Sequence, residues 1–205
     1  MELYCFGIII TIALQLIQLQ LQLVCFRSKC RIYLIFLFRR RVLRVVLLGL
    51  SGSGKSCLLQ SWKNDPQLPT YPTIGFNVVT MQRKNATIQF WDVGGDKRLR
   101  GLWRFYVTGA DSIIFVIDST VRDYNQIQET KFELHTILTN NDLKSTPIIV
   151  LFNKNDQVNK MNEEELEEEY KLKAVFQKRK GKTIMVSANF LNGVEDVMKC
   201  ITKGK

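Results

Sequence analysis

Short apolar runs alternate with segments of helical spacing through most of this chain. The runs at 112–118 and 147–152 are largely apolar, which is typical of strands buried on both faces of a sheet. Alternation of strands with helices predicts an α/β fold with a doubly wound, mostly parallel sheet. We expect strands at 42–48, 76–83, 87–92, 112–118, 147–152 and 183–186, and helices at 57–63, 97–106, 124–138, 162–180 and 193–203.

The connection between the first strand and the first helix carries the most specific pattern in the sequence. It reads Gly49-Leu50-Ser51-Gly52-Ser53-Gly54-Lys55-Ser56, which fits G-x-x-x-x-G-K-[ST]. A strand, a glycine-rich loop and a helix in this order aim backbone N–H groups and the positive end of the helix at a phosphate chain. Lys55 supplies a cation for the outer phosphates, and the Ser56 hydroxyl suits Mg²⁺. The sequence therefore predicts a nucleoside triphosphate site.

Composition divides the chain into two parts. The 205 residues carry a formal net charge of +10, and residues 1–44 hold seven basic residues and Glu2, a local net charge of +6. The rest has an ordinary charge for a soluble domain, without the stripe of basic and aromatic residues that nucleic-acid binding needs. The five cysteines show no metal-ligand spacing and indicate a reducing, cytosolic setting. We expect an N-terminal segment at 1–41 and one nucleotide-binding domain at 42–205.

The N-terminal segment has the character of a membrane-associating element. The run from Leu3 to Phe26 contains no charged residue, and Arg27, Lys29, Arg31 and the triplet at 39–41 follow it. A membrane span with its C-terminal side in the cytosol fits the one-sided basic excess. A helix lying in the membrane surface fits the glutamines in the second half of the run. A stretch without biological function is the third interpretation, and the sequence leaves all three open.

Two further motifs follow expected strands. Asp92 ends one strand and precedes Val93-Gly94-Gly95, so its carboxylate can hold a metal-bound water while the Gly95 N–H approaches a terminal phosphate. Asn153-Lys154-Asn155-Asp156 follows the buried strand at 147–152. A carboxylate at Asp156 can accept hydrogen bonds from the N1–H and exocyclic amine of guanine, and such sites reject the analogue lacking them by about 10⁴-fold or more. The Lys154 stem can pack along the base.

Together these motifs resemble the ADP-ribosylation factor (Arf) and Arf-like small GTPases. The resemblance rests on the loop at 49–56 and on 72–78, 91–95, Leu102-Trp103-Arg104 with Tyr106, and 153–156, and it covers about residues 42–203. It implies a P-loop GTPase fold that binds GTP and GDP with Mg²⁺ and acts in vesicle trafficking. Thr73 would close on Mg²⁺ and the terminal phosphate. Phe76, Trp91 and Tyr106 would be the aromatic residues through which effectors read the switch regions.

The residues expected at the ligand form three groups. The nucleotide would be held by Gly49, Ser51, Gly52, Ser53, Gly54, Lys55, Ser56, Cys57, Thr73, Gly95, Asn153, Lys154, Asp156, Ser187 and Ala188, with the Ala188 N–H meeting the guanine carbonyl. Ser56 and Thr73 would bind Mg²⁺ directly, and Asp92 through water. Lys55, Gly95 and Asp96 are the candidate catalytic residues.

The chain also departs from the pattern of the family it resembles. The usual glutamine after the two glycines is Asp96, and a position commonly occupied by aspartate is Ser51. Glu2 excludes N-myristoylation, which needs glycine after the initiator methionine. Cys5, Cys25 and Cys30 are either palmitoylation sites or free thiols.

Two functions are consistent with the sequence. The first is a GTP-hydrolysing switch on the cytoplasmic face of an intracellular membrane, with an exchange factor, an activating protein and effectors as partners. Its hydrolysis would be slow, because Asp96 lacks the amide that orients the attacking water. The alternative is a GTP-loaded membrane adaptor with negligible hydrolysis.

Overall fold

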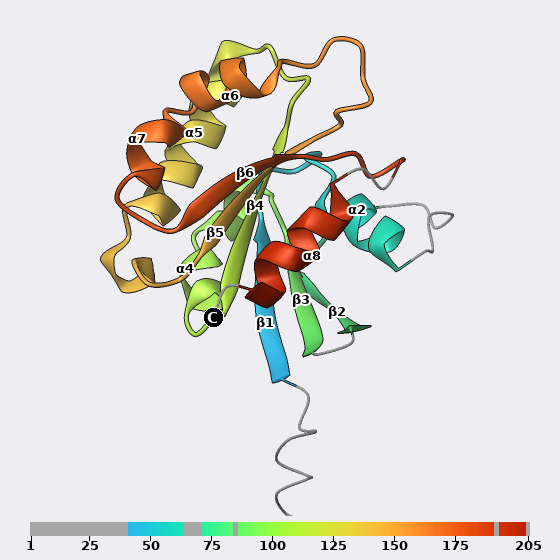
Figure 1. Ribbon diagram of the computed structural model, residues 1–205. Helices are drawn as coiled ribbons and strands as arrows, with labels where there is room; N and C mark the ends of the chain where they lie inside the picture. The colour runs from blue at the N-terminus through green and yellow to red at the C-terminus, as the bar shows by residue number, and fades with distance from the viewer. Residues whose placement is uncertain (1–40, 64–70, 84–85, 191–192, 204–205) are drawn as a thin grey trace, which may run out of the picture. The chain divides into compact units, whose positions relative to one another are not determined.

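The structure of the protein is a computed structural model, which describes residues 41–63, 71–83, 86–190 and 193–203. These form one compact unit beginning at Arg41. Figure 1 shows its central sheet, with helices on both sides. The strands are β1 Arg41–Leu48, β2 Phe76–Arg83, β3 Ala86–Val93, β4 Ser112–Asp118, β5 Ile148–Asn153 and β6 Gly181–Met185. The helices are α2 Lys55–Trp62, α3 Lys97–Arg100, α4 Trp103–Val107, α5 Tyr124–Leu138, the 3₁₀ turn η1 Asn141–Leu143, α6 Glu163–Glu169, α7 Leu172–Phe176 and α8 Val194–Lys203.

The sheet has the strand order β2-β3-β1-β4-β5-β6. All pairs are parallel except β2 with β3, which lie only two residues apart in sequence and form an antiparallel hairpin. The predicted doubly wound, mostly parallel α/β fold is therefore confirmed. β1 pairs with β3 on one side and β4 on the other, so the loop that follows β1 begins near the middle of the sheet.

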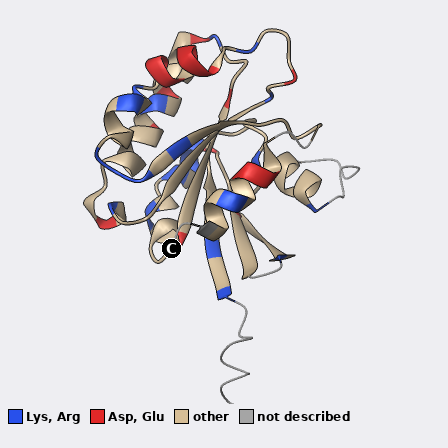
Figure 2. Ribbon diagram, viewed as in Figure 1, with Lys and Arg blue, Asp and Glu red and all other residues tan. Residues whose placement is uncertain are grey.

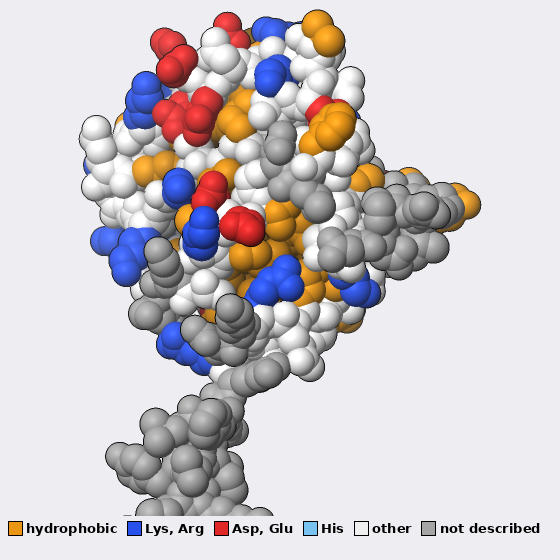
Figure 3. Space-filling model, turned by 45° about the vertical axis from the view of Figure 1, so that its right-hand side comes forward, with side chains coloured by type: hydrophobic (Ala, Val, Ile, Leu, Met, Phe, Trp, Pro, Cys, Tyr) orange, Lys and Arg blue, Asp and Glu red, His pale blue; other side chains and the backbone are white. Residues whose placement is uncertain are grey.

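Two apolar cores lie on opposite faces of the sheet. On one face, residues of α2 and α8 pack against the buried side chains of β1, β4 and β5 that include Val45 and Val116. On the other face, α4, α5, α6 and α7 cover the alternate residues, which include Val46 and Phe115. Because both faces are covered, β4 and β5 read as nearly continuous apolar runs rather than as alternating patterns. Large hydrophobic side chains also reach the surface, and Figure 3 shows several of them on one face.

The predicted helix at 162–180 was wrong, because it is two helices. The first begins with a capping box, in which Asn162 and Glu165 satisfy each other's backbone N–H groups. It ends at Glu169, and the left-handed backbone of Lys171 (φ 54°) separates it from the second helix, which begins at Leu172. In Figure 2 the ribbon of α6 is coloured mostly for acidic residues, and the basic residue within α7 is Lys173. The acidic residues at 163–169 and the basic residues at 171–180 therefore do not lie on one helix.

Three other elements differ from the prediction by more than one residue at a boundary or are divided. The helix expected at 97–106 is divided into α3 and α4, with Gly101 between them. The first helix begins at Lys55 rather than at residue 57, so the lysine and serine of the loop are already helical. β6 begins at Gly181, where a Cβ would lie 2.0 Å from an atom of the Phe176 ring. The last strand thus passes close to the Phe176 ring at the end of α7, and this ring would have to move to admit a side chain at residue 181.

Candidate nucleotide site

The loop at 49–54 owes its path to glycine. Gly49 (φ 140°) passes so close to β4 that a Cβ would lie 2.2 Å from the Val116 carbonyl oxygen. Gly54 (φ 89°) precedes α2, and a Cβ there would lie 2.2 Å from Asn153 Nδ2. The glycines therefore allow β1, β4 and the end of β5 to meet around one turn of backbone. α2 starts at this turn with no acidic residue in its first turn and no side-chain cap from the described residues, so its N-terminal N–H groups favour an anion.

Lys55 lies inside this loop. Its Nζ donates to the carbonyl oxygens of Gly49 at 2.8 Å and Leu50 at 3.0 Å. The residue is 6% exposed, and burial lowers the pKa of the ammonium group to about 8, although the charge of Asp92 opposes the shift. The amine is thus held beside the loop at a point where a phosphate group would restore its preference for the charged form.

The three predicted magnesium ligands lie together. Ser56 Oγ donates to Asp92 Oδ2 and lies 3.1 Å from Thr73 Oγ1, so one hydroxyl joins the loop, the segment before β2 and the end of β3. Asp92 is 1% exposed, and burial raises the pKa of its carboxyl group. Its other oxygen, Oδ1, has no hydrogen-bond partner among the described residues. A buried carboxylate oxygen lacking a partner, beside two hydroxyls, is a set of hard oxygen donors that suits Mg²⁺.

The two motifs at the ends of β5 and β6 also come together. Asn153 Nδ2 donates to the Ser53 carbonyl oxygen at 2.9 Å, which ties the motif to the phosphate loop across a separation of 100 residues in sequence. Asp156 accepts from Ser187 Oγ at 2.7 Å and from Asn189 Nδ2 at 3.0 Å. These hydrogen bonds, that from Ser187 foremost, lower the pKa of the Asp156 carboxyl group and keep it an acceptor.

Lys154 has a backbone conformation that is rare for residues other than glycine. Its φ is 65°, and its Nζ forms an ion pair with Asp118 Oδ2 at the end of β4. Asp118 also accepts hydrogen bonds from the backbone and hydroxyl of Thr120. The carboxylate fixes the lysine stem. Ala188, the remaining predicted residue of this group, follows Ser187 directly and packs against the core on the α8 side.

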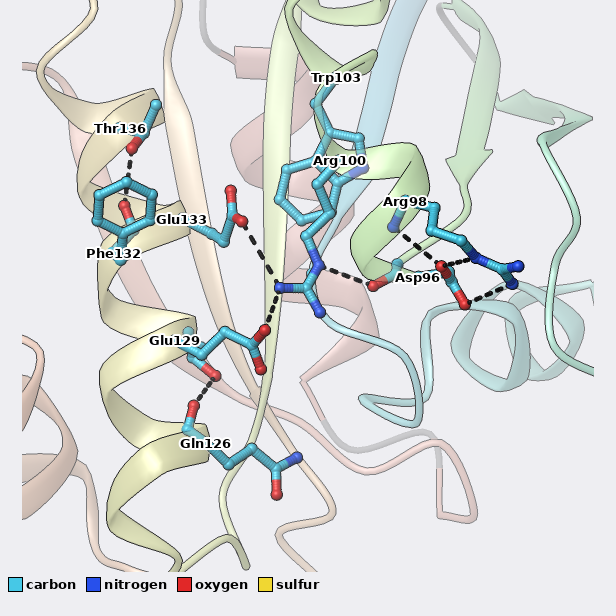
Figure 4. A network of polar contacts seen from close by, with 12 residues as sticks. Asp96, Arg98, Arg100, Trp103, Gln126, Glu129, Phe132, Glu133 and Thr136 are labelled. Atoms are coloured by element: carbon cyan, nitrogen blue, oxygen red, sulfur yellow. Dashed lines mark hydrogen bonds and ion pairs between the residues drawn. The ribbon is translucent and has the colours of Figure 1, made fainter.

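Gly95 and Asp96 have different surroundings. The Gly95 carbonyl oxygen accepts from Ser51 N–H at 3.2 Å and from Arg100 Nε at 2.9 Å, so this glycine lies directly against the phosphate loop. Asp96 points to the surface, where its carboxylate accepts the backbone N–H of Arg98 and caps α3. Figure 4 shows the Arg98 side chain bound to the same carboxylate. These hydrogen bonds lower the pKa of Asp96 to about 2.

Arg100 anchors the segment that follows Gly95. Its side chain is 8% exposed and, besides Gly95, it contacts Glu129 at 2.9 Å and Glu133 at 3.5 Å on α5 (Figure 4). The Trp103 indole N–H donates to the Gly94 carbonyl oxygen at 3.0 Å. Both glycines are therefore fixed by side chains from α3 and α4.

The three aromatic residues expected to contact effectors form a cluster. Phe76 stacks on Trp91 with 5.3 Å between ring centroids and an interplanar angle of 11°, and it lies 5.3 Å from Tyr106. The side chain of Phe76 is exposed, and the rings of Trp91 and Tyr106 are partly buried against the core. Other large hydrophobic side chains exposed in the same stretches of sequence are Tyr71, Ile74, Val78, Leu102 and Phe105.

Comparison with known protein families gives a match over residues 31–204 to the ADP-ribosylation factor family. The chain belongs to the ADP-ribosylation factor family. Among its relatives are ADP-ribosylation factors J and K of Dictyostelium discoideum, which are 44% and 45% identical to it over 123 residues. These alignments cover 60% of this chain and 64% of each relative, so the chain spans less than two thirds of their length.

Solved structures agree with this assignment to the Arf family. The Arl6 (BBS3) small GTPase of Trypanosoma brucei, determined with the nucleotide analogue GppNp, matches with a TM-score of 0.70 and 26% identity over 79% of this chain and 96% of that one. The mammalian SRP receptor shares the fold alone, with a TM-score of 0.67 and 18% identity over 79% of this chain and 100% of that one.

Sequence reasoning missed several residues of this Arf-family site. Asp118 lies at the end of a buried strand, the position that already marked Asp92 and Asn153, and this signal could have found it. Arg100 and Asn189 gave no signal, since the carboxylates that they bond, Glu129 and Asp156, lie 29 and 33 residues away in sequence. Cys57, predicted at the nucleotide, follows Ser56 in the first turn of α2 and is half-buried.

The predicted membrane segment at 1–41 lies outside the described residues except for Arg41, the first residue of β1. Within the described part of the chain, no helix is long and apolar enough to cross a membrane. The interpretations of this segment stay predictions.

Proposed function

We propose that this Arf-family protein is a guanine-nucleotide switch that binds GTP and GDP with Mg²⁺, hydrolyses GTP slowly and recruits effectors at a membrane surface. The observation that carries the proposal is the contact of Ser56 with both Asp92 and Thr73 beside Lys55. Three segments distant in sequence supply oxygen donors at the start of a helix that favours anions. Motifs for a phosphate chain and for a base lie on the same edge of the sheet.

Each end of the site would hold one part of the nucleotide. Asp156 would accept hydrogen bonds from the N1–H and exocyclic amine of guanine, and Ser187 and Asn189 orient its carboxylate for this role. The Lys154 stem, fixed by Asp118, would pack along the base, and the Ala188 N–H would donate to the guanine carbonyl. Adenine lacks the donor pair and would leave Asp156 unpaired.

The phosphate end would be held by charge and backbone donors. Lys55 would turn its ammonium group from the loop carbonyls to the outer phosphates, and the Gly95 N–H would donate to the terminal one. Ser56 and Thr73 would bind Mg²⁺ directly and Asp92 through water, and the ion would neutralise charge on the phosphate oxygens. Thr73 lies in the segment before β2, so its participation would depend on which nucleotide is bound.

Slow hydrolysis follows from Asp96. A carboxylate cannot donate a hydrogen bond to the attacking water, and its charge opposes a transition state that is already anionic. Its low pKa removes it as a general base, since a base of pKa about 2 stays ionised but binds a proton weakly. This observation also favours the second candidate, a GTP-loaded membrane adaptor with negligible hydrolysis.

Single-turnover hydrolysis, measured beside the dissociation rate of GTP, tests the proposal. The switch predicts that bound GTP is cleaved faster than it dissociates, and the adaptor predicts the reverse. Failure to bind GTP at all would contradict both functions.

A further inference from the structure

Arg44 is a charged residue in a stretch that otherwise reads as a buried strand. Its neighbours Leu43 and Val45 belong to the core on the α2 side, so Arg44 faces the side covered by α4 and α5. In the pairing of β1 with β3, Val46 lies opposite Trp91. Trp91 is thus the diagonal neighbour of Arg44, within reach of a long side chain.

The guanidinium group of Arg44 joins two elements. Its central carbon lies 4.4 Å from the centroid of the Trp91 ring, a cation–π contact. Nη2 donates to the Tyr106 carbonyl oxygen at 3.0 Å, and Nη1 donates to that of Thr108 at 2.9 Å. Both carbonyls lie at the C-terminal end of α4, where helical carbonyls lack partners and a cation is favoured.

The backbone of Arg44 is fixed as well. Its N–H donates to Asp111 Oδ2 at 2.9 Å, and its carbonyl oxygen accepts from the Asp111 N–H at 2.8 Å. The side chain therefore extends from a rigid point in β1 rather than from a loop. It reaches the two elements that carry Trp91 and Tyr106, two of the three rings in the aromatic cluster.

We propose that Arg44 is a positioning residue of the effector surface, which holds Trp91 and α4 in the arrangement that partner proteins contact. The inference rests on the proposed function, since that function assigns effectors to the cluster. Phe76 contacts both other rings but is itself exposed. A partner that inserts apolar side chains would displace Phe76 easily unless Trp91 and Tyr106 were held in place beside it. Arg44 holds them in place by connecting β3 to α4.

The test uses the full chain in lipid nanodiscs, labelled with 5-fluorotryptophan. The three tryptophans, Trp62, Trp91 and Trp103, give separate ¹⁹F signals, and Trp91→Phe assigns that of Trp91. Arg44→Met keeps the aliphatic stem and removes the guanidinium group, and Arg44→Lys keeps the stem and the charge but loses the planar guanidinium and its paired donors. Arg122→Met is the matched control, because Arg122 is bonded to Asn159 and Lys160, outside the cluster.

The second readout is binding to a synthetic protein domain. The domain is selected for binding to the chain loaded with a non-hydrolysable GTP analogue and counter-selected against binding to Phe76→Ala. Its binding therefore depends on the aromatic cluster. We expect Arg44→Met to shift the signal of Trp91 and, to a lesser degree, that of Trp103 in α4, to leave the signal of Trp62 in α2 unchanged, and to weaken binding of the domain at least ten-fold. The affinity of Arg44→Lys for the domain should fall between those of the parent chain and Arg44→Met, and that of Arg122→Met should stay within two-fold of the parent chain. The affinity for GDP should be unchanged in all three variants.

Two results would overturn the proposal. One is an unchanged Trp91 signal and domain affinity in Arg44→Met, and the other is a joint movement of all three tryptophan signals, which marks general loosening. If Arg44→Met does not fold, Arg44→Lys is measured in the same way, and failure of both to fold assigns Arg44 to stability alone. The ¹⁹F readout needs no nucleotide, so failure of the proposed function alone would give a distinct result: no GTP is bound, yet the Trp91 signal shifts while that of Trp62 stays in place.

Discussion

Burial shifts the pKa values of Lys55 and Asp92 in opposite directions, and in both cases against the charged form. The ammonium group becomes more acidic and the carboxyl group less acidic than in water. Each has a partner that partly offsets the shift, since Asp92 favours the charged lysine and both Ser56 and Lys55 favour the charged aspartate. A ligand that brings a phosphate to the lysine and a cation to the carboxylate would stabilise the charged form of both side chains, so such a ligand is the one that the site favours.

The pKa of Lys55 predicts that nucleotide affinity falls as the pH rises. In the free protein Lys55 loses its proton above about pH 8, while phosphate groups beside it would raise its pKa. Binding above pH 8 therefore takes up a proton, and the Kd for GDP should rise between pH 8 and 9, by about ten-fold per pH unit at most. Competition against labelled GDP from pH 7 to 9 measures this change.

Lys55→Met is the control for that measurement. It should bind GDP weakly and without the same rise over this range. An equal rise in both proteins would mean that another group titrates. A Kd for the parent chain that stays constant from pH 7 to 9 would contradict the assignment of Lys55 to the phosphates.

Asp96→Gln should speed single-turnover GTP hydrolysis by about ten-fold or more, because the amide can orient water and the negative charge is removed. Asp96→Asn separates the two effects, since it removes the charge without the reach of glutamine. An unchanged or lower rate in Asp96→Gln would show that this residue does not limit hydrolysis.

At the scale of the elements, the prediction from sequence differs from the structure where the conformation or contact of one residue interrupts a regular pattern. Periodicity found α5 at 124–138 with its bounds correct, because its apolar positions repeat regularly and Asp123 caps it. The same reasoning fused α6 with α7, since the left-handed backbone of Lys171 leaves no mark in a run of charged residues. The early start of β6 depends on contact between Gly181 and Phe176, which no local pattern contains.

The break between α6 and α7 predicts a stabilising substitution. Lys171 has φ 54°, a conformation that costs a residue with a Cβ and costs glycine nothing. Lys171→Gly should raise the free energy of unfolding by up to about 1 kcal/mol. Chemical denaturation measures it, with Lys173→Gly inside α7 as the control, which should lower stability by a similar amount. Equal losses in both variants would contradict the account of the break.

At the scale of the whole molecule, the sequence predicted which motifs lie at one edge of the sheet, but it did not predict the side-chain contacts that connect distant elements. Motifs at strand ends gave the fold class and brought Ser56, Asp92, Asn153 and Asp156 to one edge, because parallel strands end on the same side. Arg44 was read as part of the basic N-terminal charge, yet its side chain contacts Trp91 and α4. Such long-range polar contacts depend on the packed fold.

The N-terminal segment predicts membrane attachment of the whole chain. The uncharged run from Leu3 to Phe26 and the basic residues behind it should keep the full chain with membranes, while a chain beginning at Arg41 should be released. Carbonate and high-salt washes of a membrane fraction divide the interpretations. Resistance to both indicates a span, release indicates an interfacial helix, and a soluble full-length protein would contradict membrane attachment.

Competition for the nucleotide site tests the central claim most directly. Labelled GDP bound to the full chain should be displaced by GTP, and ATP should need a concentration about 10⁴-fold higher or more. Asp156→Asn should reverse part of this preference in favour of xanthosine triphosphate. The asparagine amide can donate a hydrogen bond to the carbonyl oxygen that xanthine carries in place of the exocyclic amine of guanine. Displacement by ATP as effective as that by GTP would contradict the account of this protein as a guanine-nucleotide switch.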